Sequence, residues 1–300
     1  MNHPRHRIRS ATPVLALLAL LGAQASLAGS PRKTTPAMEE PLSAQELVRE
    51  VIYNENQAQL DDQSLWRYRA LETEGGKTEL LDVLETREGT IQRLLAINHH
   101  PLTASQRRRE DARLRRLAAN PQAVVKASQN RHQDAEQGRK LMDLLPDAFV
   151  YEYDGSEGDE IRLRFQPNPN FRPPNREAQV FHHMEGTMWV DRRQKRLAAI
   201  EGRLTSEVKF GYGLLGHLNE GGTFYVKQQD EGAGHWEMTD LDVEMSGRAL
   251  FFKTIGVQEK ESLFDFEQMP DDTTLEQGES LLEENGAAPA KAALASGKKN

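Results

Sequence analysis

Residues 235–245 read HWEMTDLDVEM, and this stretch carries the strongest indication of the fold. Trp236 and Met238 lie at even-numbered positions, whereas the apolar residues from Leu241 to Met245 lie at odd-numbered positions. We call this alternation the parity of the apolar residues. Because neighbouring side chains of a strand point to opposite faces, the apolar side can change only at a bulge, a bend or a break. A strand with such an irregularity is typical of a strongly curved sheet.

The residues around this stretch have the pattern of further strands. After Pro146, apolar and polar residues alternate in short segments that are separated by turns, and no helical periodicity intervenes. Consecutive strands without crossover helices pair antiparallel. We therefore expect antiparallel strands at residues 149–153, 161–165, 187–191, 197–204, 207–212, 223–229, 235–245 and 249–255.

The first half of the chain predicts helices on either side of a meander. Ser43 and Glu46 have capping-box spacing ahead of a short amphipathic helix, and Thr103 and Gln106 repeat that spacing ahead of an Arg-rich helix. Pro121 begins a further helical pattern. Strand patterns lie between the first two helices, at residues 65–73, 78–85 and 90–97. The chain thus predicts an α+β fold that is mainly antiparallel β.

The two ends predict segments outside the folded domain. Residues 1–28 combine arginines, the apolar run VLALLALL and small residues at cleavage spacing, so we expect a secretory signal peptide cleaved near Ala28. Residues 29–42 predict a flexible leader, and residues 43–268 a single domain. Residues 269–300 are acidic at first and then rich in Ala and Lys, which predicts a disordered tail that folding does not need.

Composition narrows the class of protein. The chain has no cysteine, which excludes a lipid-anchored lipoprotein, disulfides and thiolate chemistry. Its net charge of −8 becomes more negative once the arginines of the signal are removed, so nucleic acid is not an expected partner. No later apolar run reaches bilayer length, which predicts no transmembrane segment in the mature chain. We expect a soluble periplasmic protein.

No catalytic or metal motif stands out. The chain contains neither a G-x-S-x-G elbow nor a Gly-rich phosphate loop nor an H-E-x-x-H pair. The histidine pairs at 99–100 and 182–183 offer at most one ligand each to a common site if they lie on strands, because adjacent side chains diverge. We therefore expect no enzyme, no metal site and no cofactor.

Several segments of the second half resemble a known family. They are strand patterns punctuated by glycine and tryptophan, namely Gly186–Asp191 (GTMWVD), Leu197–Leu204 (LAAIEGRL), residues 210–213 (FGYG), Trp236 and residues 247–253 (GRALFFK). These segments resemble proteins described as outer-membrane lipoprotein-sorting or LolA-like, and the similarity covers much of residues 66–255.

The resemblance implies a curved, open β-barrel with helices packed on or plugging its concave face. Members of the family with known roles hold acyl chains between the sheet and the helices. We therefore expect a periplasmic carrier that holds a lipid or a lipoprotein acyl chain. The alternative is an envelope sensor or protein-binding module of the same fold without lipid transfer. The length of this chain, its Arg-rich helix and its acidic tail depart from the well-known carriers.

Candidate binding residues follow from the apolar strand faces. A carrier cavity needs inward apolar side chains that are incompletely packed, although each candidate is also explained by an ordinary core. The loop at residues 166–174 (QPNPNFRPP) is a candidate flap or a plain connection. The cavity candidates are Phe165, Phe171, Met188, Phe210, Leu241, Val243 and Met245. The Arg-rich helix offers a candidate partner surface made of Arg107, Arg108, Arg109, Arg113 and Arg116.

Overall fold

The computed structural model describes residues 42–210, 216–232, 234–249 and 253–285, and its main element is one large antiparallel sheet. The strands lie in the order β4-β3-β2-β1-β13-β12-β11-β8-β7-β6-β5, while β9 and β10 form a hairpin beside β12. Their bounds are β1 Leu65–Glu74, β2 Lys77–Thr86, β3 Gly89–Ile97, β4 His100–Pro101, β5 Phe149–Glu157, β6 Glu160–Pro167, β7 Met184–Asp191, β8 Leu197–Leu204, β9 Val208–Phe210, β10 Gly216–Leu218, β11 Thr223–Gly232, β12 His235–Ala249 and β13 Lys253–Met269.

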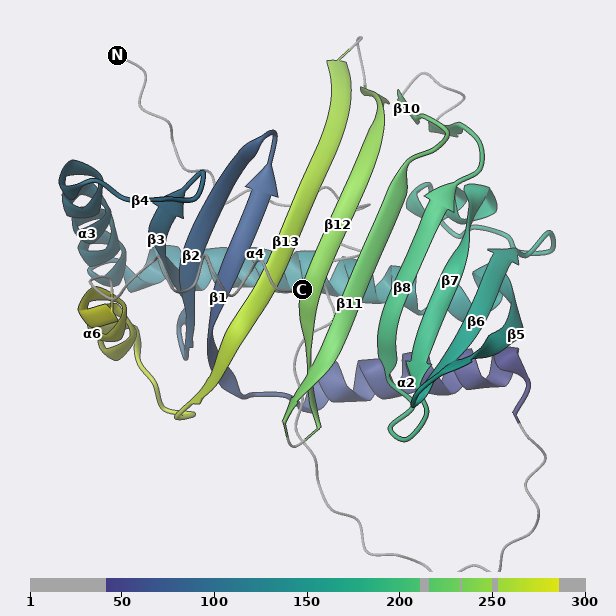
Figure 1. Cartoon of the computed structure of the whole chain (residues 1–300), viewed down its shortest axis with the longest axis horizontal. Coiled ribbons are helices and arrows are strands. Elements are labelled where there is room, and N and C mark those ends of the chain that lie inside the picture. Colours follow the sequence, from purple (N-terminus) through teal and green to yellow (C-terminus); the bar gives the residue numbers. More distant parts are fainter. Residues whose placement is uncertain (1–41, 211–215, 233, 250–252, 286–300) are drawn as a thin grey trace, which may run out of the picture.

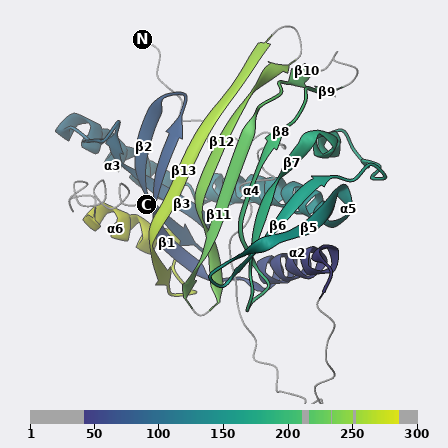
Figure 2. The same ribbon diagram turned by 45° about the vertical axis from the view of Figure 1, so that its right-hand side comes forward.

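Helices cover one face and one edge of this sheet. Helices α2 and α4 lie behind the strands in Figure 1, and α3 and α6 lie beside the edge formed by β3 and β4. The helices are α2 Ala44–Asp61, α3 Ala104–Ala118, α4 Pro121–Met142, α5 Leu145–Ala148, the 3-10 helix η1 Glu177–His183 and α6 Leu275–Asn285. The sheet is curved and does not close (Figure 2). The predicted α+β fold with an open, curved antiparallel sheet is therefore confirmed.

The predicted irregularity at residues 238–241 is a β-bulge in β12. Lys227 of β11 pairs with Asp240 of β12, but Gln228 pairs with Met238, so Thr239 is an extra residue in β12. This bulge moves the apolar side chains on either side of it onto the same face, as expected. Met238 and Leu241 accordingly lie in one apolar cluster.

Helix α2 is attached to the sheet by a buried ion pair. The Arg196 guanidinium donates from Nε and Nη2 to the two carboxylate oxygens of Glu55 at 2.7 and 2.9 Å, and the Leu197 amide donates to the same carboxylate at 2.8 Å. Both charged side chains are less than a tenth exposed. The Arg196 guanidinium also lies 5.8 Å from the centre of the Trp236 ring, which adds a cation–π contact. The pair therefore joins helix α2 to the start of β8 and to β12.

The prediction of a disordered tail from residue 269 was wrong for residues 275–285. Thr274 and Gln277 exchange hydrogen bonds at capping-box spacing, and helix α6 follows. Leu275 and Leu282 are buried against Leu84 and Ile91. The free energy gained by burying these two leucines exceeds the entropic cost of ordering the helix. The prediction of disorder rested on the acidic composition and did not take this burial into account. Residues 286–300 and the predicted signal and leader up to residue 41 lie outside the described residues.

The position of α6 predicts that the C-terminal segment contributes to stability, whereas composition predicted a tail that folding does not need. Ending the chain after Met269 removes two buried leucines and exposes Leu84 and Ile91, so we expect a loss of about 2 to 3 kcal/mol of unfolding free energy. Thermal unfolding of the shortened chain measures it. A chain ending after Asn285 keeps α6 and serves as the control. An unchanged midpoint for both truncations would show that α6 contributes nothing to stability.

Candidate functional site

The helix-covered face of the sheet carries one continuous apolar layer. Six of the seven predicted cavity residues are buried in a single cluster there, and Phe210 packs at its margin. The six come from four segments, namely β6, the loop after it, β7 and β12, and none is more than 7% exposed; they are Phe165, Phe171, Met188, Leu241, Val243 and Met245. The structure thus brings the predicted cavity residues together on one face.

Helix α4 crosses this layer but is buried only near its ends. Val124 is buried at one end, and Gly138, Leu141 and Met142 at the other, while no residue between Val124 and Gly138 is buried. At 1.5 Å per residue this middle part is roughly 20 Å long. It passes behind β13, β12 and β11 in Figure 1. The middle of α4 therefore spans the sheet rather than packing tightly against it.

The proline-rich loop at residues 166–174 contributes to the same layer. Phe171 is 7% exposed, and its ring lies 6.3 Å from the ring of Phe181 and 5.8 Å from that of His182. The Phe171 amide donates to the Asn168 carbonyl at 3.1 Å. The loop is thus fixed to η1 through one aromatic side chain, an arrangement that fits either a plain connection or the closed position of a flap.

Carboxyl groups continue the apolar rows of the same face. Across the sheet, Glu72 of β1 pairs with Glu261 of β13, which pairs with Leu241 of β12; one row further, Glu259 pairs with Val243. Burial and the neighbouring carboxylates raise the pKa of Glu72 to about 7 and that of Glu261 to about 8. The apolar layer therefore ends at carboxyl groups whose pKa values lie near neutral pH, well above those of exposed carboxyls.

A second polar group fills the place where β12 and β13 separate. Their pairing ends at Asp240 and Ser262, while β13 continues beside β1 to Met269; Figure 1 shows the two strands diverging at their lower ends. Here the rings of Trp66 and His235 lie 5.1 Å apart. We call the polar group at this separation the split cluster; its members are Glu85, Gln228, His235 and Glu237.

The split cluster is buried and poorly satisfied. Desolvation raises the pKa of Glu237 to about 8 and that of Glu85 to about 7. The negative charge of Asp62 raises both pKa values further, and the charge of Glu85 adds to the rise for Glu237. Glu237 Oε1, His235 Nδ1 and both polar atoms of Gln228 are buried without a hydrogen-bond partner among the described residues. Such an arrangement can take up and release protons near neutral pH, but it pairs no nucleophile with a base.

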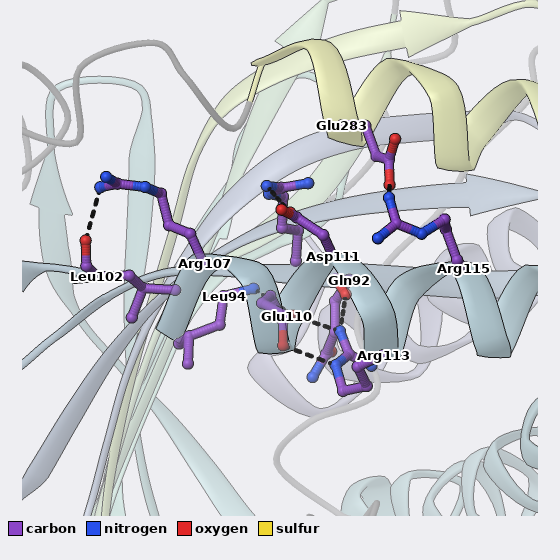
Figure 3. A network of polar contacts seen from close by, with 10 residues as sticks. Gln92, Leu94, Leu102, Arg107, Glu110, Asp111, Arg113, Arg115 and Glu283 are labelled. Atoms are coloured by element: carbon purple, nitrogen blue, oxygen red, sulfur yellow. Dashed lines mark hydrogen bonds and ion pairs between the residues drawn. The ribbon is translucent and has the colours of Figure 1, made fainter. Parts of the chain in front are cut away.

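The arginines of α3 mostly bind the chain itself (Figure 3). Arg107 donates to the Leu102 carbonyl at 2.7 Å, and Arg115 to Glu283 of α6 at 2.9 Å. Arg113 donates to Glu110, whose carboxylate also accepts from the Leu94 amide of β3 at 2.9 Å. These contacts attach α3 to β3 and α6.

The predicted partner surface is therefore only partly available. Arg107 and Arg113 bind as described, and Arg116 donates to the carbonyl of Ala112 in its own helix at 2.9 Å. Arg108 and Arg109 are exposed and have no partner within the described part of the chain. A role for this helix in binding another protein stays a prediction that rests on these two side chains.

Metal ligands do not gather in the described part of the chain. No three His, Asp or Glu side chains lie close enough together there to hold a metal ion. His99 lies in the turn after β3 with φ 63°, and His183 shares a hydrogen bond of 2.7 Å with Ser206. Within residues 42–285 as described, no helix has the length and apolarity needed to cross a membrane.

The buried carboxyls are the site residues that sequence reasoning missed, although a signal was present. Glu72 shares its parity with Trp66, Tyr68 and Ala70, the residues from which the strand itself was predicted. Parity thus placed Glu72 on the apolar face. The burial of Glu261 had no such signal, because its segment was assigned to an acidic end of the domain rather than to a strand.

Comparisons of this chain with protein-family models, with curated proteins and with solved structures found no match.

Proposed function

We propose that this protein is an exported periplasmic carrier that holds an acyl chain between the concave face of the sheet and helix α4. One observation carries the proposal: α4 is buried only near its ends and spans the apolar face between them. A helix that served only to complete a core would bury one side along its whole length. A span of this kind allows a ligand chain to lie over Leu241 and Val243.

The neighbouring carboxyls narrow the class of ligand. Glu72, Glu259 and Glu261 continue the rows of Leu241 and Val243, so the polar end of a bound lipid would lie near them. An anionic head group there would face carboxylates as soon as they ionise, which costs free energy at close range. The proposed ligand therefore carries its acyl chain on a neutral ester or amide, as in an acylated lipoprotein, rather than as a free fatty acid.

Replacing Val243 with Phe tests the carrier. If a ligand occupies space over Val243, the larger ring should fill that space, so binding should fall at least tenfold while the unfolding midpoint changes little. The measurement is titration with a fluorescent monoacylglycerol and with the matching fatty acid. The neutral probe should bind more tightly, and the difference should widen above pH 8.

Val190→Phe is the matched control. Val190 of β7 is buried in the same cluster. It pairs with Leu197, the first residue of β8, whose amide donates to Glu55 of α2. Overpacking there should cost about 1 to 3 kcal/mol. Equal destabilisation by both substitutions, together with no binding of either probe by the unmodified protein, would contradict the carrier and favour a protein-binding module of the same fold.

A further inference from the structure

The opposite face of the sheet, which no helix of the described residues covers, carries a groove. It has a volume of about 580 Å³ and crosses β6, β7, β8, β11 and β12. This volume lies within the range of about 300 to 1,000 Å³ that is usual for small-molecule sites. Because adjacent side chains of a strand point to opposite faces, the groove lies on the other side of the sheet from the apolar layer of the proposed carrier site.

Two outward rows of side chains form the walls of the groove. In one row Thr187 pairs with Glu201, and Glu201 with Tyr225; in the other Glu185 pairs with Arg203, and Arg203 with Thr223. All six side chains line the groove. Each row crosses β7, β8 and β11 in register, so the walls follow the hydrogen-bonding direction of the sheet.

The floor between the walls consists of an inward row that contains two glycines. Phe165, Gly186, Gly202 and Phe224 pair in that order across four strands, and all four line the groove. A Cβ atom on Gly186 would lie 2.0 Å from the Glu201 carbonyl oxygen, and one on Gly202 would lie 2.5 Å from the Phe224 ring. Only glycine fits these positions, and the two phenyl rings close over them from the apolar side.

All but one of the charged side chains that line the groove form ion pairs among the described residues, the exception being Glu201. Arg203 pairs with Glu185 at 2.5 Å, Arg164 with Asp154 at 3.3 Å, and Asp242 with Lys260 at 2.6 Å. By contrast, five polar side chains of the lining make no hydrogen bond within the described part of the chain: Gln166, Thr187, Glu201, Thr223 and Tyr225. The groove therefore offers free donors and acceptors with little uncompensated charge.

We propose that this groove binds a neutral, hydroxyl-rich ligand, namely a short oligosaccharide. An amide, a carboxylate, two threonine hydroxyls and a phenol together supply donors and acceptors for the hydroxyls of a sugar. The phenol ring of Tyr225 supplies apolar contact for the C–H face of a sugar ring. A strongly charged ligand would gain little, because Glu201 is the one lining charge without an ion pair in the described part of the chain, and it is exposed to solvent.

Titration with maltotriose, cellotriose and N,N′,N″-triacetylchitotriose, all of which are neutral, tests the proposal. Saturation-transfer NMR and calorimetry should detect at least one of these probes with a Kd below 10 mM, on the order expected for a shallow open site. Thr223→Trp places an indole in the groove and should weaken binding at least tenfold. Lys227→Trp is the control, because Lys227 lies on the same strand and the same face but outside the lining.

A second variant covers the case in which Thr223→Trp disturbs the sheet. Glu201→Ala removes one acceptor from an exposed position and should weaken binding several-fold with an unchanged unfolding midpoint. The proposal is overturned if none of the three probes binds at 10 mM, or if Lys227→Trp weakens binding as much as Thr223→Trp. A bound monoacylglycerol should leave the sugar affinity unchanged, so failure of the carrier and failure of the groove are distinguishable.

Discussion

Replacing Glu55 with Ala is expected to lower the unfolding free energy by about 3 to 5 kcal/mol, because it leaves the Arg196 guanidinium buried and unpaired. The pair is less than a tenth exposed on both sides, and the Glu55 carboxylate also holds the Leu197 amide. The substitution thus removes three hydrogen bonds that attach α2 to β8. For a domain of this size the unfolding midpoint should fall by roughly 10 °C.

An exposed ion pair on a helix provides the control for Glu55. Glu136 pairs with Lys140 at 2.8 Å on α4, with both side chains more than half exposed. Glu136→Ala should leave the unfolding midpoint nearly unchanged, because exposed ion pairs contribute little to stability. The double variant Glu55→Ala, Arg196→Met should recover part of the loss, because no charge then remains buried. A Glu55→Ala protein as stable as Glu136→Ala would show that α2 does not depend on this pair.

Stability is expected to decline as the pH rises from 5 to 9, by an amount on the order of 5 kcal/mol. Burial raises the pKa of Glu237 and of Glu261 from 4.5 to about 8 in the folded protein. Between these values the folded state binds more protons than the unfolded state, so stability falls as pH rises. The contribution is fully present below pH 4.5 and is lost once the pH passes 8.

Urea unfolding at a series of pH values measures this decline. Glu261→Gln keeps the shape of the side chain but removes its ionisation, so it should flatten the curve and stabilise the protein at pH 9. Glu157 lies at the exposed end of β5, and Glu157→Gln should leave the slope unchanged. A wild-type curve that rises between pH 6 and pH 9 would contradict the burial of these carboxyls.

The sequence also explains why the carrier site and the split cluster were not equally predictable. The apolar parity of Leu241, Val243 and Met245 is a local property, and it placed those residues on one face without any knowledge of their neighbours. The split cluster arises because β12 leaves β13 at Asp240. The position at which two strands stop pairing depends on the whole sheet. A local sequence pattern therefore does not predict whether Glu237 and His235 are exposed or buried.

Local patterns determined the elements of this protein. Capping boxes at Ser43 and Thr103 fixed where two helices begin, and the parity change between Met238 and Leu241 fixed a bulge and hence a curved sheet. The same kind of pattern was present at Thr274, where Thr274 and Gln277 cap α6. The prediction of a disordered tail followed the acidic composition instead of this capping pattern. In the structure the burial of Leu275 and Leu282 stabilises the helix.

Tertiary structure alone decided which side chains act together. The row of Glu72, Glu261 and Leu241 joins residues far apart in the chain, and so does the groove row of Thr187, Glu201 and Tyr225. The sequence determines the face on which each of these residues lies, because side chains alternate along a strand. It does not determine their partners, because strand order and register are set by pairing between distant segments and by the bulges that shift it.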